Sequence, residues 1–98
     1  MDKVNVQQQG KRLVVTGELT RRTVIKRFEK QSTGLLNQQI QLIDLAKVTQ
    51  SDTAGLAWLL LIIEYAKQQS ISLKIINIPH ELIKLAKLSA VDSFLPVE

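Results

Sequence analysis

The sequence predicts a single α/β domain with a four-stranded mixed sheet in the order 1-2-3-4 and its helices mainly on one face. Ninety-eight residues suffice for one hydrophobic core. Hydrophobic periodicity gives the element order β-β-α-β-α-β-α, without linkers or low-complexity segments. Two consecutive strand–helix–strand units require right-handed crossovers, which place the last three strands side by side and parallel. The first strand is then antiparallel to the second.

The N-terminal third predicts a β-hairpin followed by a helix. Residues 4–6 and 13–16 alternate around a glycine-containing turn at residues 7–11. We expect the second strand to end near Thr20, which would cap the helix, and the helix to end at residues 32–34. Apolar residues recur there at helical spacing opposite a basic face: Val24, Ile25, Phe28 and Leu35.

The centre of the chain predicts a buried strand, a polar loop and a long helix. Residues 40–45 are apolar and β-branched, and residues 47–51 are polar. The following apolar run is too long and too rich in leucine for a strand, so it predicts a helix over residues 53–69. Asp52 is a suitable N-cap, and Gly55 would let the helix approach a strand end closely.

The C-terminal third predicts the last strand and the last helix. Residues 71–77 alternate as a strand does. Pro79 suits the first turn of a helix whose apolar positions continue to Leu88. The tail, residues 92–98, has room for one more helical turn before Pro96.

A helical wheel divides the residues of the central helix into two faces. The face assigned to the sheet comprises Gly55, Leu56, Leu59, Ile62, Ile63 and Ala66. The opposite face comprises Thr53, Ala57, Leu60, Leu61, Glu64 and Gln68, with Trp58 and Tyr65 on one flank. Because an ordinary surface helix is charged along its outer face, either neighbouring helices cover this side or it is a docking patch. Leu59 and Ile63 are expected in the core, and Thr53, Ala57 and Leu61 at the surface.

Composition and charge limit the classes of function. The absence of cysteine excludes disulfide and thiolate chemistry, and no apolar run is long enough to span a bilayer. The N-terminal segment is charged and rich in glutamine, which predicts no signal peptide. The net charge of +4 lies largely within residues 21–30. A solvated helix face is favoured there over a nucleic-acid site because interleaved aromatic residues are missing.

Catalytic and metal-binding patterns are not found in the sequence. His80 is the only histidine and follows a proline at a helix start, so capping or exposure is favoured over catalysis. Glu18, Asp44 and Asp52 are expected near the carboxyl ends of strands, where three acids could hold Mg²⁺. The favoured interpretation is that Asp52 caps, Asp44 bonds loop amides and Glu18 is exposed. We therefore predict no enzyme activity, no metal and no cofactor.

Residues 43–56 resemble the signature of STAS domains, the family of sulfate-transporter tails and anti-sigma-factor antagonists. The pattern is a strand ending in Asp-Leu, here Asp44-Leu45, followed by Asp-Ser/Thr-x-Gly-Leu at the next helix, here residues 52–56. Residues 17–19, Gly-Glu-Leu, also resemble the family. The resemblance covers essentially the whole chain and implies one STAS-like domain over residues 1–98.

Residues 52–61, 66–69 and 85–88 are similar to one STAS group, the small cytoplasmic subunit of the Gram-negative phospholipid transporter that maintains outer-membrane lipid asymmetry. This resemblance implies a non-catalytic subunit at the inner-membrane face that binds the ABC ATPase beside the permease and supports assembly and activity. It implies no direct nucleic-acid contact and no direct membrane insertion. It also implies that Thr53 lies at the contact. Because the apolar face below Thr53 has too few helices to cover it, we predict that the docking surface comprises Thr53, Ala57, Leu60, Leu61 and Glu64.

The alternative within the family is an anti-sigma-factor antagonist. There, the hydroxyl at the helix start, here Thr53, is phosphorylated by an anti-sigma kinase, which releases the partner. A phosphate would be favourable at a helix N-terminus but would add charge to an apolar contact. Threonine in place of the usual serine, and the long leucine run, favour the transporter group.

Overall fold

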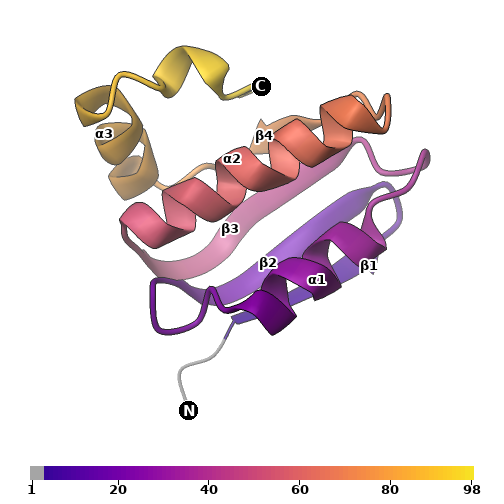
Figure 1. The fold of residues 1–98 in the computed structure, drawn as a ribbon, viewed down its shortest axis with the longest axis horizontal. Coiled ribbons are helices and arrows are strands. Elements are labelled where there is room, and N and C mark those ends of the chain that lie inside the picture. The colour runs from indigo at the N-terminus through magenta and orange to yellow at the C-terminus, as the bar shows by residue number, and fades with distance from the viewer. Residues whose placement is uncertain (1–3) are drawn as a thin grey trace.

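The computed structural model describes residues 4–98, which form one four-stranded sheet in the order β1-β2-β3-β4 (Figure 1). This confirms the predicted fold class and strand order. Figure 1 shows α1 and α2 lying across the same face of the sheet. The elements are β1 (Val4–Gln9), β2 (Arg12–Leu19), α1 (Lys26–Leu35), β3 (Leu42–Ser51), α2 (Thr53–Gln68), β4 (Lys74–Ile76), α3 (His80–Leu88) and the 3-10 turn η1 (Asp92–Phe94).

Strand pairing also follows the prediction. β1 and β2 are antiparallel, and β2, β3 and β4 are mutually parallel. The strands of the hairpin are longer than expected, because pairing continues to Gln9 and Arg12 and leaves a two-residue turn. Gly10 occupies this turn with φ 63°, a left-handed conformation that glycine adopts without strain.

The polar loop expected at residues 47–51 is wrong, because β3 continues through these residues to Ser51. They pair with the end of β2 across two register shifts, one of them at Gly17, whose φ is 102°. Such irregularities are typical of β-bulges, and they keep the strands paired where simple alternation fails. β4 pairs only with Leu42–Asp44, so the second half of β3 lies beyond the reach of β4.

The start and end predicted for α1 are also corrected. Thr20 does not cap the helix; its carbonyl accepts the amides of Thr23 and Val24 in a turn, and α1 begins only at Lys26. At the other end the hydroxyl of Ser32 donates to the Phe28 carbonyl, 2.6 Å away, as a helical residue can. The helix continues to Leu35, one residue beyond the predicted end.

The C-terminal elements agree with the prediction in kind but differ in length. β4 covers only three residues of the expected strand, because the chain before Lys74 has no strand partner. Pro79 is the N-cap residue of α3, and the turn expected in the tail is η1. After η1 the chain forms a parallel bridge between Val97 and Ile75 on the outer side of β4.

One continuous hydrophobic core lies between the sheet and the helices. Its central side chains have almost no exposed surface, and they come from β2, β3, β4, α2 and α3. No helix within residues 4–98 is long and apolar enough to cross a membrane. The largest fully buried side chains include Leu13, Val15, Leu19, Ile40, Ile43, Leu45, Leu59, Ile62, Ile75 and Leu82.

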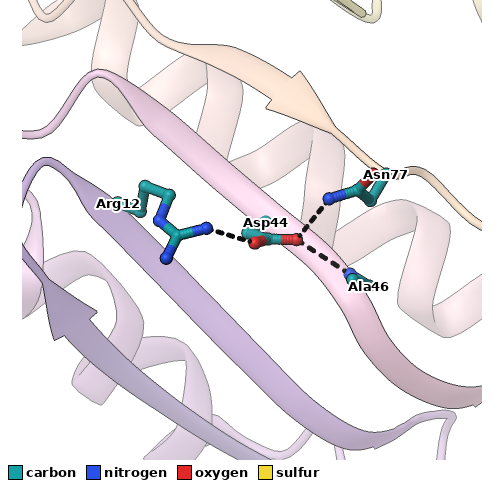
Figure 2. A network of polar contacts seen from close by, with 4 residues as sticks. All are labelled: Arg12, Asp44, Ala46 and Asn77. Carbon is teal, nitrogen blue, oxygen red and sulfur yellow. Dashed lines mark hydrogen bonds and ion pairs between the residues drawn. The ribbon is translucent and has the colours of Figure 1, made fainter.

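A polar network centred on Asp44 joins three elements (Figure 2). Its carboxylate accepts from Arg12 of β2 at 2.8 Å, from the Asn77 amide after β4 at 3.0 Å and from the Ala46 backbone at 3.0 Å. Burial raises the pKa of Asp44, but these hydrogen bonds and the charges of Arg12 and Lys47 outweigh it and lower the pKa below 3.8.

We expect Asp44→Asn to lower the free energy of unfolding by about 1–2 kcal/mol at neutral pH, because Arg12 loses its charged partner. A carboxyl group whose pKa is lower in the folded than in the unfolded protein stabilises the folded state at pH values above its unfolded pKa. The stabilisation by Asp44 is therefore lost as the pH falls below 3.8 and then passes below the lowered pKa of Asp44 in the folded protein. Urea unfolding from pH 7 to pH 2 should show the two proteins converging in acid; a constant difference would contradict the prediction.

Candidate functional site

The N-terminus of α2 is held by Asp52, as predicted. Its Oδ1 accepts the amides of Ala54 at 2.9 Å and Gly55 at 3.3 Å. Its Oδ2 accepts the amide of Arg21 at 3.1 Å. One carboxylate therefore caps the helix and ties the β2–α1 connection to it, which leaves the adjacent Thr53 exposed at the first helical position.

Gly55 permits the close contact between helix and strand end that the sequence predicted, and the strand involved is β2. A Cβ atom at Gly55 would collide with the carbonyl oxygen of Leu19 and would lie 2.9 Å from the Leu19 Cβ. Only a residue without a side chain lets α2 start this close to the end of β2. The glycine thus sets the position of Thr53 relative to the sheet.

The outer face of α2 presents a strip of exposed residues, which we call the α2 strip: Thr53, Ala57, Leu61 and Glu64. The predicted inner face is buried at every position, with Leu59 fully inaccessible and Leu61 42% exposed. Leu60, the remaining residue of the predicted partner-binding set, is half-buried and packs against the core. The exposure expected for Thr53, Ala57 and Leu61 is confirmed, as is the burial of Leu59 and Ile63.

Neighbouring helices pack on the two sides of α2 and cover part of its apolar surface. Trp58 is buried against α1, where its ring lies 5.2 Å from that of Phe28 and its indole N–H donates to Ser32 Oγ at 3.1 Å. α3 packs along the other side. Neighbouring helices therefore cover both flanks, whereas within residues 4–98 no element covers the α2 strip.

A groove of about 340 Å³ lies between the end of β3 and the start of α3. Its lining comes from the end of β3 and the start of α3: Val48, Thr49, Gln50, Ser51, Pro79 and Glu81. The groove could not be predicted from the expectation of a loop at residues 47–51, because its lining depends on the strand continuing there. The β-branched pair Val48-Thr49 was the one local signal that the strand continues.

The three acids singled out in the sequence do not form a joint site. Glu18 is buried rather than exposed, and its carboxylate accepts from the Thr20 hydroxyl at 3.2 Å. Asp44 lies within β3 rather than near its end, and Asp52 is the α2 cap. In the described part of the chain no three acidic or histidine side chains are grouped to hold a metal ion. His80 is exposed at the start of α3 and makes no side-chain cap.

Comparison with known proteins agrees with this geometry. The family described as "Mlab, STAS domain" matches residues 3–96. The intermembrane phospholipid transport system binding protein MlaB of Escherichia coli K12 is 33% identical over 81 residues, covering 83% of this chain and 81% of that protein. The protein of the same name from Shigella flexneri matches equally well.

Two solved structures share the fold. The unphosphorylated anti-sigma factor antagonist SpoIIAA superimposes with a TM-score of 0.64 at 14% identity, covering 97% of this chain and 87% of that chain. The inward-facing murine anion transporter Slc26a9 gives 0.59 at 16% identity, covering 84% of this chain but only 14% of that chain. At such identities these likenesses concern the fold alone. The family match and the one-third identity to the bacterial relatives show that this chain belongs to the MlaB-like STAS domain family.

Proposed function

We propose that this protein is the non-catalytic cytoplasmic STAS subunit of a phospholipid-transporting ABC complex. In this proposal it binds the ATPase subunit through Thr53, Ala57, Leu60, Leu61 and Glu64, and it supports the assembly and activity of the complex beside the permease. It sits at the inner-membrane face through its partners rather than by inserting into the bilayer. The relatives from E. coli and S. flexneri, named for an intermembrane phospholipid transport system, support the assignment.

The observation that carries the proposal is the apolar part of the α2 strip. Ala57 and Leu61 are exposed on a helix whose other apolar residues are largely buried. Exposed apolar surface beside polar residues is typical of protein–protein contacts. Thr53 and Glu64 border this surface at either end, and the groove lined by residues 48–51 adds a recess at the end of β3, just before α2 begins in the chain.

The alternative is an anti-sigma-factor antagonist that is regulated by phosphorylation at Thr53. The exposed hydroxyl next to a capped helix N-terminus is compatible with that chemistry. The likeness to SpoIIAA supports only a shared fold. Affinity purification from the native cell separates the two functions, since the first predicts an ABC ATPase and the second a histidine-kinase-like ATPase.

Thr53→Glu is the decisive variant for the docking surface. We expect it to fold with near-normal thermal stability, because a negative charge at a helix N-terminus is mildly stabilising. It should nevertheless lose the ATPase, because an unpaired charge buried in an apolar interface costs several kcal/mol. Melting temperature, co-purification with the ATPase and ATP turnover of the complex are the measurements.

Thr53→Gln is the matched control, since it has nearly the same size as the glutamate but no charge. We expect more ATPase to co-purify with Thr53→Gln than with Thr53→Glu. If Thr53→Glu binds as well as wild type, the docking surface lies elsewhere. If it unfolds, Thr53 is a structural residue of the helix start and the docking role is wrong.

A further inference from the structure

The net charge of this protein comes from one short segment. Residues 21–30, which we call the basic segment, contain five of the thirteen basic residues and one of the nine acidic residues. The segment alone therefore carries +4, equal to the net charge of the whole chain, and the remaining residues are balanced. Such a concentration creates a local positive potential, whereas evenly mixed surface charges largely cancel.

All five cations are exposed: Arg21, Arg22, Lys26, Arg27 and Lys30. None of them forms an ion pair within residues 4–98, where the single salt bridge joins Arg12 to Asp44. The positive face is therefore not used to stabilise the fold in the described structure. Ile25, between the arginines and the lysines, is 52% exposed and adds an apolar side chain to the same surface.

The fold places the basic segment next to the α2 strip. The Arg21 backbone amide donates to the Asp52 carboxylate that caps α2, so the start of the basic segment lies at the N-terminus of α2. Further along, the Phe28 ring of α1 packs against the Trp58 ring of α2. Figure 1 shows α1 and α2 lying next to each other on the sheet. The exposed cations of α1 are therefore on the helix next to the one that carries the α2 strip. An apolar centre with a charged rim is the usual anatomy of a specific protein interface.

Resting on the proposed function, we propose that the basic segment is the electrostatic rim of the ATPase-docking surface and that it contacts a cluster of carboxylates on the ATPase subunit. The α2 strip forms the apolar centre of the contact. The cations accelerate encounter and fix the orientation of the two proteins, as rim charges do. The same surface fits nucleic acid poorly, because Phe28 and Trp58 are buried and are not available to stack on bases.

The test compares two double charge reversals that leave the same net charge. Arg22→Glu/Lys30→Glu changes the basic segment, and Lys11→Glu/Lys74→Glu changes exposed lysines of the hairpin turn and of β4. Each double variant takes the net charge from +4 to zero, so only the position of the charge differs. Association and dissociation rates with the purified ATPase subunit are measured at roughly 50 mM and roughly 500 mM NaCl.

We expect reversal of the basic segment to slow association about tenfold at low salt, and the control reversal to slow it less than about twofold. The difference should narrow at high salt, where charges are screened. Equal association rates for the two double variants, with wild type still binding, would contradict the proposed role of the basic segment as the rim. The proposed function would be unaffected by that result. No binding by wild type would overturn the proposed function itself.

Other polyanions are tested in parallel with wild type and the same variants. Phosphatidylglycerol vesicles probe an anionic lipid surface, and single-stranded RNA probes nucleic acid. The reversal of the basic segment could abolish binding to the vesicles or to the RNA and leave association with the ATPase unchanged. In that case the segment binds that polyanion, and the proposed rim of the ATPase-docking surface is wrong. We expect instead that neither probe competes with the ATPase for wild-type protein.

Discussion

Replacing Leu59 by alanine is expected to lower the free energy of unfolding by about 2–5 kcal/mol, which corresponds to a fall in melting temperature of about 10 °C or more. Leu59 is fully inaccessible at the centre of the inner face of α2. Its removal leaves a cavity between α2 and the sheet, and side chains in this close-packed core can relax only in part.

Leu61→Ala is the matched control for this experiment, because it makes the same chemical change two residues further along the same helix. Leu61 is 42% exposed, so we expect its truncation to cost under about 1 kcal/mol. Urea unfolding of both variants, with midpoints compared at unchanged slope, measures the difference. A larger loss for Leu61 than for Leu59 would contradict the assigned orientation of α2.

The orientation of α2 could be predicted because it depends on local sequence. Gly55, Leu59 and Ile63 recur at helical spacing, and the structure buries all three. The strand order could be predicted for a related reason, since consecutive crossovers leave few permitted arrangements. The N-cap at Asp52 follows from a side chain and amides within three residues of it.

The errors concern pairings between residues far apart in the chain. Residues 47–51 are polar and look like a loop, and they form a strand because the end of β2 pairs with them across a bulge. Glu18 was expected at the surface, but it is buried where the end of β2 pairs with β3, at the position opposite Gln50. In both cases the deciding partner contributes no periodic signal to the local sequence.

The candidate site, too, could be predicted from the sequence only in part. Thr53, Ala57 and Leu61 could be placed on an outer face from the helical wheel alone. The groove at the end of β3 and the contact between the Arg21 amide and Asp52 depend on how β2, β3 and α3 meet. The charge of residues 21–30 was visible in the sequence, but its position next to the α2 strip was not.

Gly55→Ala is expected to destabilise the protein by about 3 kcal/mol although alanine is the better helix former. The gain in helix propensity is at most about 1 kcal/mol. Against it stands a collision between the new methyl group and the Leu19 carbonyl oxygen, a backbone atom in a paired strand that cannot rotate away. The start of α2 must therefore shift from β2, which also displaces Thr53 and weakens the proposed contact with the ATPase.

Gly34→Ala is the control that separates the collision from the helix propensity. Gly34 also lies within a helix, α1, but a Cβ atom there would meet nothing within 4 Å. We expect this variant to be unchanged or stabilised by up to about 1 kcal/mol and to bind the ATPase normally. Thermal melts and ATPase co-purification of both alanine variants measure the contrast. A Gly55→Ala protein as stable as wild type would show that α2 can start further from β2 without loss, and the close contact would then not be what positions Thr53.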